Sequence, residues 1–232
     1  MSRLLSLSVF WVLLLAVPVF TGCSDDEETT PAPQPTATAR VMAVHASPDA
    51  PGVDLLVDNV KVNSAPLTFP NNTAYLTVNA GLRNVKVNVA GTSTTVINAD
   101  LPVAANAVYS VFATDSVAAL TPIVLLDTLT APATGNAHVR FIHLSPNAPA
   151  VDIALQGGAV IFANKAFQQY TAFTPLPAGT YNLEVRLAGT STVVLPLPGV
   201  ALTAGKIYTV WAKGFVGGTG TQALGAQIIA NN

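Results

Sequence analysis

Hydrophobic and polar residues alternate one by one along several short stretches of the chain. Residues 85–91 read VKVNVAG and residues 183–189 read LEVRLAG. Side chains of a β-strand point alternately to the two faces of a sheet, so this period of two predicts half-buried strands. Residues 108–113 (VYSVFA) and 207–212 (IYTVWA) show the same pattern.

Turn-forming sequences separate these stretches. PDAPG, NAG, PAG, AGTS and TAGK supply the glycine, proline, Asn and Asp residues that tight turns prefer. No run of about 10–12 residues carries a helical period with caps. Short strands with turns at intervals of about 8–12 residues predict an all-β fold built of β-sandwiches.

The chain contains one sequence twice. VHASPDAPGVDLLV (44–57) returns as IHLSPNAPAVDIAL (142–155), and NAGLRNVKVNVAGTST (79–94) returns as PAGTYNLEVRLAGTST (177–192). In both pairs the offset is 98 residues, which matches a small domain rather than a solenoid unit.

The repeat therefore predicts two tandem immunoglobulin-like or transthyretin-like β-sandwich domains. We expect the first at residues 40–131 and the second at residues 138–232. The segment DTLTAPATGNA (127–137) would join them, and its composition predicts some hinge motion.

The repeat also resembles DUF4397, a bacterial envelope domain family of unknown function. The shared features are the opening HxSPxAPxVD, a central AGxYxxxVxxAGT-like hairpin and a late YTVxA strand, and they cover both copies, from residue 40 to about residue 230. The first copy departs in the hairpin, with Leu82 and Arg83 in place of Thr180 and Tyr181. The resemblance implies an architecture and a location rather than a reaction, because the family has no established activity.

The first 22 residues predict a lipoprotein signal peptide. Arg3 provides a positive start, residues 4–20 form an apolar run, and small residues precede Cys23. The segment resembles the lipobox of bacterial lipoproteins, although Phe20 departs from the usual aliphatic residue. The resemblance implies that Cys23 is acylated and attaches the protein to a membrane. The alternative is an uncleaved N-terminal anchor, since a membrane span needs about 20 apolar residues.

Residues 23–39 predict a flexible tether. The acidic run SDDEE (24–28) looks like an export signal that sends lipoproteins to the outer face of the outer membrane, which predicts a surface-exposed protein. A solvated acidic tether on a periplasm-facing protein is the alternative. Residues 29–39 (TTPAPQPTATA) form a Pro- and Thr-rich spacer.

Charge is scarce, which narrows the possible partners. Charged residues make up 9% of the chain and the net charge is −2. Without a basic stripe we expect no nucleic-acid partner. A single cysteine leaves no internal disulfide framework and no cysteine-based zinc site, and we expect no cofactor.

The repeated HxSPxAPxVD motif carries most of the reactive residue types. Its members are His45, Ser47, Pro48 and Asp54 in the first copy, and His143, Ser145, Pro146 and Asp152 in the second. A nucleophile–base–orienter set uses the same types. The structural interpretation is favoured: His or Ser caps a turn that starts at the proline, and the Asp closes a bond across the PDAP loop. We therefore predict no catalytic residue.

Other candidate sites are weaker. Calcium binding by Asp49, Asp54 and Asp58 is disfavoured because the second copy has fewer carboxylates. His138 and His143 would face opposite sides of a strand, so no metal site is predicted. Most aromatic residues lie in strand patterns, which indicates a core. The Gly-rich segment 213–224 would expose Phe215 as a ligand loop or form a plain hairpin turn.

Together these patterns favour a non-catalytic, lipid-anchored cell-surface module for adhesion or for glycan or protein binding. Duplication would raise avidity if both copies bound the same repeating partner. One alternative is a structural or accessory envelope protein that packs with a membrane partner. A hydrolase that uses the HxSPxAPxVD motif is a further alternative.

Overall fold

β-Strands provide nearly all the regular structure between Thr36 and Asn232. The computed structural model describes residues 36–232, and Thr36–Asn232 form one unit. The predicted signal peptide, Cys23, the acidic run and most of the predicted tether lie outside the described residues. Within residues 36–232, no helix is both long and apolar enough to cross a membrane.

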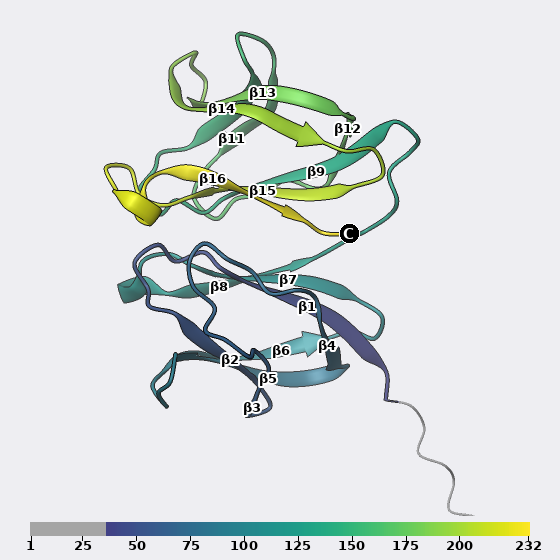
Figure 1. Cartoon of the computed structure of the whole chain (residues 1–232), viewed down its shortest axis with the longest axis vertical. Helices are drawn as coiled ribbons and strands as arrows, with labels where there is room; N and C mark the ends of the chain where they lie inside the picture. The colour runs from purple at the N-terminus through teal and green to yellow at the C-terminus, as the bar shows by residue number, and fades with distance from the viewer. Residues whose placement is uncertain (1–35) are drawn as a thin grey trace, which may run out of the picture. The chain divides into compact units, whose positions relative to one another are not determined.

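The first copy of the repeat is a sandwich of two four-stranded sheets (Figure 1). One sheet has the order β4-β1-β7-β8 and the other has the order β3-β2-β5-β6. Neighbouring strands are antiparallel except for the central pair β1 and β7. The strands are β1 (Thr38–His45), β2 (Val53–Val57), β3 (Val60–Lys61), β4 (Leu76–Asn79), β5 (Gly81–Val89), β6 (Thr95–Val103), β7 (Val108–Thr114) and β8 (Thr121–Leu126).

The second copy repeats this topology with the orders β12-β9-β15-β16 and β11-β10-β13-β14. Its central pair, β9 and β15, is again parallel. The strands are β9 (Asn136–His143), β10 (Val151–Leu155), β11 (Val160–Lys165), β12 (Thr174–Pro177), β13 (Gly179–Leu187), β14 (Val193–Leu202), β15 (Ile207–Lys213) and β16 (Gly225–Ala230). The prediction of an all-β fold with two β-sandwiches is confirmed.

Each sandwich encloses its own hydrophobic core. Val53, Leu55 and Val87 contribute to the core of the first, and Phe141, Ile153 and Val185 contribute to the core of the second. These residues occupy alternate positions of their strands, as the period of two predicts. Tyr109, Val111 and Ala113 alternate along β7 with Ser110, Phe112 and Thr114.

The central strands β1 and β7 bury residues on both faces. Met42, Val44 and Phe112 point away from the first core, yet at most 2% of each is exposed. They share a hydrophobic cluster with Ile142, Leu144, Trp211 and Ile229 of the second copy. Central strands with two buried faces carry longer apolar runs, and the β1 sequence TARVMAVH fits that pattern.

This shared cluster opposes the hinge motion expected at residues 127–137. Relative domain motion is the usual expectation unless an interface is large and hydrophobic. Here Phe69 of the first copy also packs edge-to-face on Trp211 of the second, with ring centroids 6.2 Å apart. The two sandwiches therefore share a packed interface.

Candidate functional site

The two motif histidines hold the loops that follow them. His45 ends β1 and its Nε2 lies 2.9 Å from the Pro51 carbonyl oxygen, and His143 Nε2 lies 3.0 Å from the Pro149 oxygen. A carbonyl can only accept, so Nε2 carries the proton and donates it. Burial lowers the pKa of both imidazoles below the ordinary value. Each histidine is therefore a neutral clamp on its loop.

The motif serines are fully buried beside these loops. Ser145 Oγ donates to the Gly214 carbonyl oxygen at 2.6 Å, so this hydroxyl proton does not point at an imidazole. The following prolines, Pro48 and Pro146, begin the turns at the strand ends, as their position in the sequence predicted. Ser145, buried and bonded to a carbonyl, is therefore not an activated nucleophile, whereas the buried Ser47 hydroxyl has no hydrogen-bond partner within residues 36–232.

The motif aspartates hold a different turn from the one expected. Asp54 Oδ2 accepts from the Gly91 N–H at 3.0 Å, and Asp152 Oδ2 accepts from the Gly189 N–H at 2.9 Å. Both glycines lie in the AGTST turns and have positive φ angles. The predicted bond across the PDAP loop is wrong, because the side chain of each Asp reaches the hairpin turn of the neighbouring strands instead.

The three carboxylates considered for calcium have separate partners. Asp49 accepts from the Val117 N–H at 2.8 Å, and Asp58 pairs with Arg83 at 2.9 Å. Asp54 pairs with Lys61 at 2.7 Å, and this ammonium, with the Gly91 N–H, lowers the pKa of Asp54. Within residues 36–232 no group of three His, Cys, Asp or Glu side chains is placed to hold a metal ion.

The Gly-rich segment 213–224 is a loop that hydrogen bonds hold in place. The Asn147 side chain bonds both backbone groups of Val216, accepting at 2.8 Å and donating at 3.1 Å. A Cβ on Gly214 would lie 2.2 Å from the Ala223 carbonyl oxygen, so only glycine fits there. Phe215 is half-buried rather than exposed, which favours the plain turn over the ligand loop.

Polar side chains line the outer face of the first sandwich in two facing rows. We call this surface the amide face, and it comprises Asn84, Lys86 and Asn88 on β5 and Thr95, Asn98 and Asp100 on β6. The strand register places Asn84 opposite Asp100, Lys86 opposite Asn98 and Asn88 opposite Thr95. The three β6 residues are exposed, and the three β5 residues are partly exposed.

Hydrogen bonds preorganise the amide face. Asn84 Nδ2 donates to Asn98 Oδ1 at 3.0 Å and to Asp100 Oδ1 at 2.9 Å. Thr95 Oγ1 donates to Asn88 Oδ1 at 2.9 Å. Asn side chains offer both donors and acceptors, and a hydroxyl offers both as well. The face is therefore a fixed array of groups that can bond a polyhydroxylated ligand.

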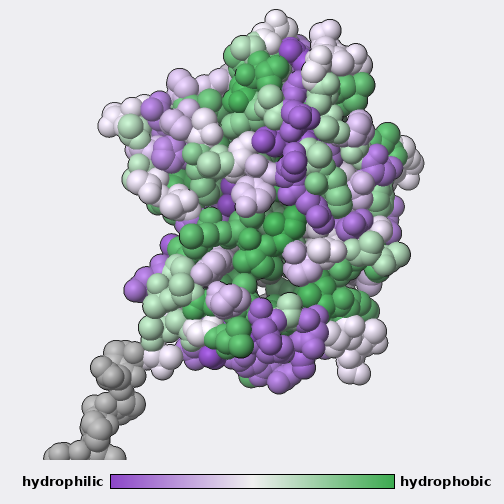
Figure 2. Space-filling view, turned by 180° about the vertical axis from the view of Figure 1, so that it is seen from behind, coloured by the Kyte–Doolittle hydropathy of each residue, from purple (hydrophilic) through white to green (hydrophobic). Residues whose placement is uncertain are grey.

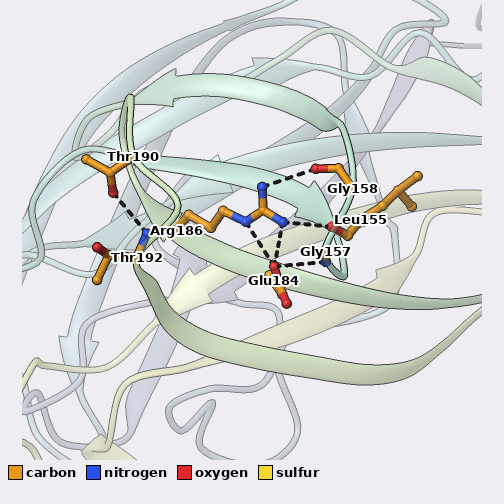
Figure 3. A network of polar contacts seen from close by, with 7 residues as sticks. All are labelled: Leu155, Gly157, Gly158, Glu184, Arg186, Thr190 and Thr192. Carbon is orange, nitrogen blue, oxygen red and sulfur yellow. Dashed lines mark hydrogen bonds and ion pairs between the residues drawn. The ribbon is translucent and has the colours of Figure 1, made fainter.

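The equivalent face of the second sandwich has different chemistry. Glu184 and Arg186 stand where the first copy has Lys86 and Asn88. Arg186 donates to Glu184 Oε2 at 2.6 Å and to the Gly158 and Leu155 carbonyl oxygens at 3.1 and 3.0 Å; Figure 3 shows these contacts. These contacts hold the β10–β11 turn. The outer face of the second sandwich therefore lacks an array of amide and hydroxyl groups like that of the amide face.

A buried polar ring joins the two sandwiches, and sequence reasoning missed it. Arg140 Nη1 lies 2.7 Å from Asp127 Oδ1, with side chains that are 3% and 0% exposed. Tyr75 donates to Asp127 Oδ2 at 2.6 Å and accepts from Asn231 at 2.9 Å. Thr209 closes the ring by accepting from Arg140 and donating to Asn231, both at 2.8 Å. Burial, together with the Asp127 carboxylate, raises the pKa of Tyr75 to about 12.

The ring is structural rather than a reaction centre. Its carboxylate and guanidinium are closed off from solvent, so no substrate reaches them. The signal in the sequence was weak: Arg140 and Asp127 lie in β9 and just after β8, and no motif links them. Only the assembled pair of sheets brings them together.

The fold and these sites define a tandem β-sandwich protein whose motif residues hold loops and turns. The family model of DUF4397, a domain of unknown function, matches residues 39–154, which is half of the chain. The protein belongs to the DUF4397 family.

No curated protein matches the chain. Among solved structures, a family 26 carbohydrate-binding module from Eubacterium rectale in complex with maltoheptaose is 12% identical. That match covers 82% of this chain and 96% of the module, with a TM-score of 0.26. A similarity at this TM-score carries no argument about ligand or function.

Proposed function

We propose that this protein is a non-catalytic, lipid-anchored module of the bacterial cell envelope that binds glycans on the amide face. The observation that supports this proposal is the preorganised array of amide, hydroxyl and carboxylate groups on β5 and β6. Sugar hydroxyls donate and accept hydrogen bonds, so an array of both kinds of partner suits them. Groups already fixed in place lose little conformational entropy on binding.

Only the first sandwich offers this face. In the second copy Pro196 stands where the first has Asn98, and Arg186 and Glu184 bond each other. The proposal is therefore a single glycan site per chain rather than two identical sites. Avidity would then require several proteins on one surface.

A glycan-binding measurement tests the proposal directly. The chain from residue 24 onward is screened on an array of soluble oligosaccharides, and the hits are titrated by calorimetry. Asn84→Ala with Asn98→Ala should weaken binding at least tenfold. Asn182→Ala removes the same side chain at the equivalent position of the second copy and should leave binding unchanged. An array without hits, or equal losses in both variants, would refute the assignment.

The location of the protein is tested separately. We propose that Cys23 is acylated and that the acidic run at 24–28 carries the protein to the outer face of the outer membrane. Cys23→Ser should abolish labelling by a radioactive fatty acid. Protease treatment of intact cells should remove the wild-type protein and spare a variant with residues 25–28 changed to alanine. Full protection of both proteins would favour the accessory envelope role instead.

A further inference from the structure

A cavity of about 110 Å³ lies between the two sheets of the first sandwich. Its walls are almost wholly hydrophobic. Val41, Ala43 and Val111 line it from one sheet, and Leu55, Val87 and Ala99 line it from the other. Protein interiors contain few voids larger than a water molecule, so a cavity of this size in a β-sandwich core calls for a physical cause.

Comparison with the second copy gives that cause. The corresponding space in the second sandwich is only about 20 Å³. There Phe141 pairs with Val210 at the position where Ala43 pairs with Val111, and Leu197 occupies the position of Ala99. Two alanines in place of a Phe and a Leu leave the same fold incompletely filled.

The cavity reaches the surface at one edge of the sandwich. Among its lining residues, Ala99, Asp100, Pro122 and Val124 are exposed, and Val124 is 42% exposed. All four belong to β6 and β8, which are edge strands of the two sheets. A ligand can therefore enter between these strands without unfolding a sheet. Figure 2 shows a hydrophilic patch at the lower end of the molecule, on the first sandwich, with hydrophobic side chains above it.

We propose that the first sandwich binds a small apolar ligand in this cavity, either an aromatic ring or the end of a short alkyl chain. Water is a poor occupant because it needs about 2–4 polar partners, which these walls do not offer. An apolar cavity of about 150 Å³ in another protein stays dry and takes up benzene, so this cavity has a comparable scale. The cavity walls lie on the inner side of β5 and β6 and the amide face on their outer side, so the two sites share only Asp100 at the mouth of the cavity.

Benzene and hexan-1-ol are the probes for this site. Each is titrated into the whole soluble chain from residue 24 onward, and binding is measured by calorimetry and by the shift of the melting temperature. The wild type should bind at least one of them. Ala99→Leu and Ala43→Phe install the residues of the second copy and should each weaken binding at least tenfold.

A matched control separates filling of the cavity from a general effect of added bulk. Ala105→Leu adds the same side chain to the exposed β6–β7 turn and should bind like the wild type. Ala99 lies on an exposed edge, so Ala99→Leu decides the question if Ala43→Phe does not fold. The proposal is overturned if the wild type binds neither probe, or if Ala99→Leu binds both as tightly as the wild type. Asn84→Ala should leave the affinity for these probes unchanged, which keeps this test independent of glycan binding.

Discussion

At the scale of single residues, the two clamp histidines predict how stability depends on pH. Their pKa is lowered in the folded state, so below about pH 6.5 the unfolded chain binds protons that the folded chain does not. The contribution of the two histidines to the free energy of unfolding should be fully present above that pH and should fall as the solution becomes more acidic. His45→Gln with His143→Gln keeps a donor to each proline carbonyl but cannot be protonated.

We therefore expect the double variant to lose less stability than the wild type between pH 7.5 and pH 5. Urea unfolding at each pH measures the difference. His138→Gln, at a partly exposed histidine on β9, is the control that removes a histidine without touching either clamped loop. Parallel pH profiles for the wild type and the double variant would contradict the assignment.

Asp152 predicts a second effect at this scale. Its two carboxylate oxygens accept from the Asn164 N–H at 2.6 Å and the Gly189 N–H at 2.9 Å, and the residue is 5% exposed. Asp152→Ala leaves those backbone groups without this partner, which should cost about 1–3 kcal/mol of unfolding free energy. Urea denaturation measures the loss. Asp100→Ala removes an exposed carboxylate from β6 and should cost less.

At the scale of the strands, Phe141 explains why the space inside the second sandwich is smaller than the cavity of the first. The residue is 1% exposed and fills the place that Ala43 leaves open in the first copy. Phe141→Ala should cost about 3–5 kcal/mol, because it removes buried apolar surface and leaves a void. The same variant should gain binding of benzene. Phe215→Ala in the half-buried loop is the comparison and should cost clearly less.

The strands and turns could be predicted from the sequence because their signals are local. A period of two, a glycine with a positive φ angle at Gly91 and Gly189, and a proline at each strand end depend on neighbouring residues alone. The repeat at an offset of 98 residues then predicted the second sandwich from the first. A turn-holding role for Asp54 could be predicted, but the predicted turn was wrong, because its partner Gly91 is 37 residues away along the chain.

The candidate sites were harder to predict because they depend on how sheets meet. Lys86 and Asn88 could be assigned to an outer face by alternation, but the opposing row on β6 follows only from the register. The cavity exists because Ala43 and Ala99, on opposite sheets, both have small side chains. No pattern along the chain reveals that these two residues face the same space. The burial of Phe112 and Trp211 could have been suspected, since their strands carry apolar residues on both faces.

At the scale of the whole molecule, the same face of each copy forms the interface between the sandwiches. Phe112 and Trp211 are equivalent residues, as are Val44 and Ile142, and all four belong to one cluster. The polar ring also contains residues from equivalent positions of the two copies. Asp127 and Asn231 both donate a backbone N–H to the start of the adjacent central strand, at Val108 and Ile207. An isologous interface of this kind is the usual arrangement of two identical subunits.

The ion pair within this interface predicts a test of how tightly the sandwiches are coupled. Arg140 stands at the position of Met42 in the first copy, and Asp127 at the position of Asn231 in the second. Arg140→Met leaves a buried carboxylate without its cation and should cost about 3–5 kcal/mol. Adding Asp127→Asn removes that charge and should recover much of the loss, since a buried ion pair often contributes little over a neutral replacement.

Urea unfolding of the wild type, both single variants and the double variant completes the cycle. Because the paired atoms are 2.7 Å apart, we expect the two changes to be strongly non-additive. The coupling also has a visible consequence: calorimetry of the wild type should give one transition, whereas Arg140→Met should separate or broaden it as the sandwiches unfold independently. Additive losses with an unchanged single transition would mean that the hydrophobic cluster alone joins the two copies.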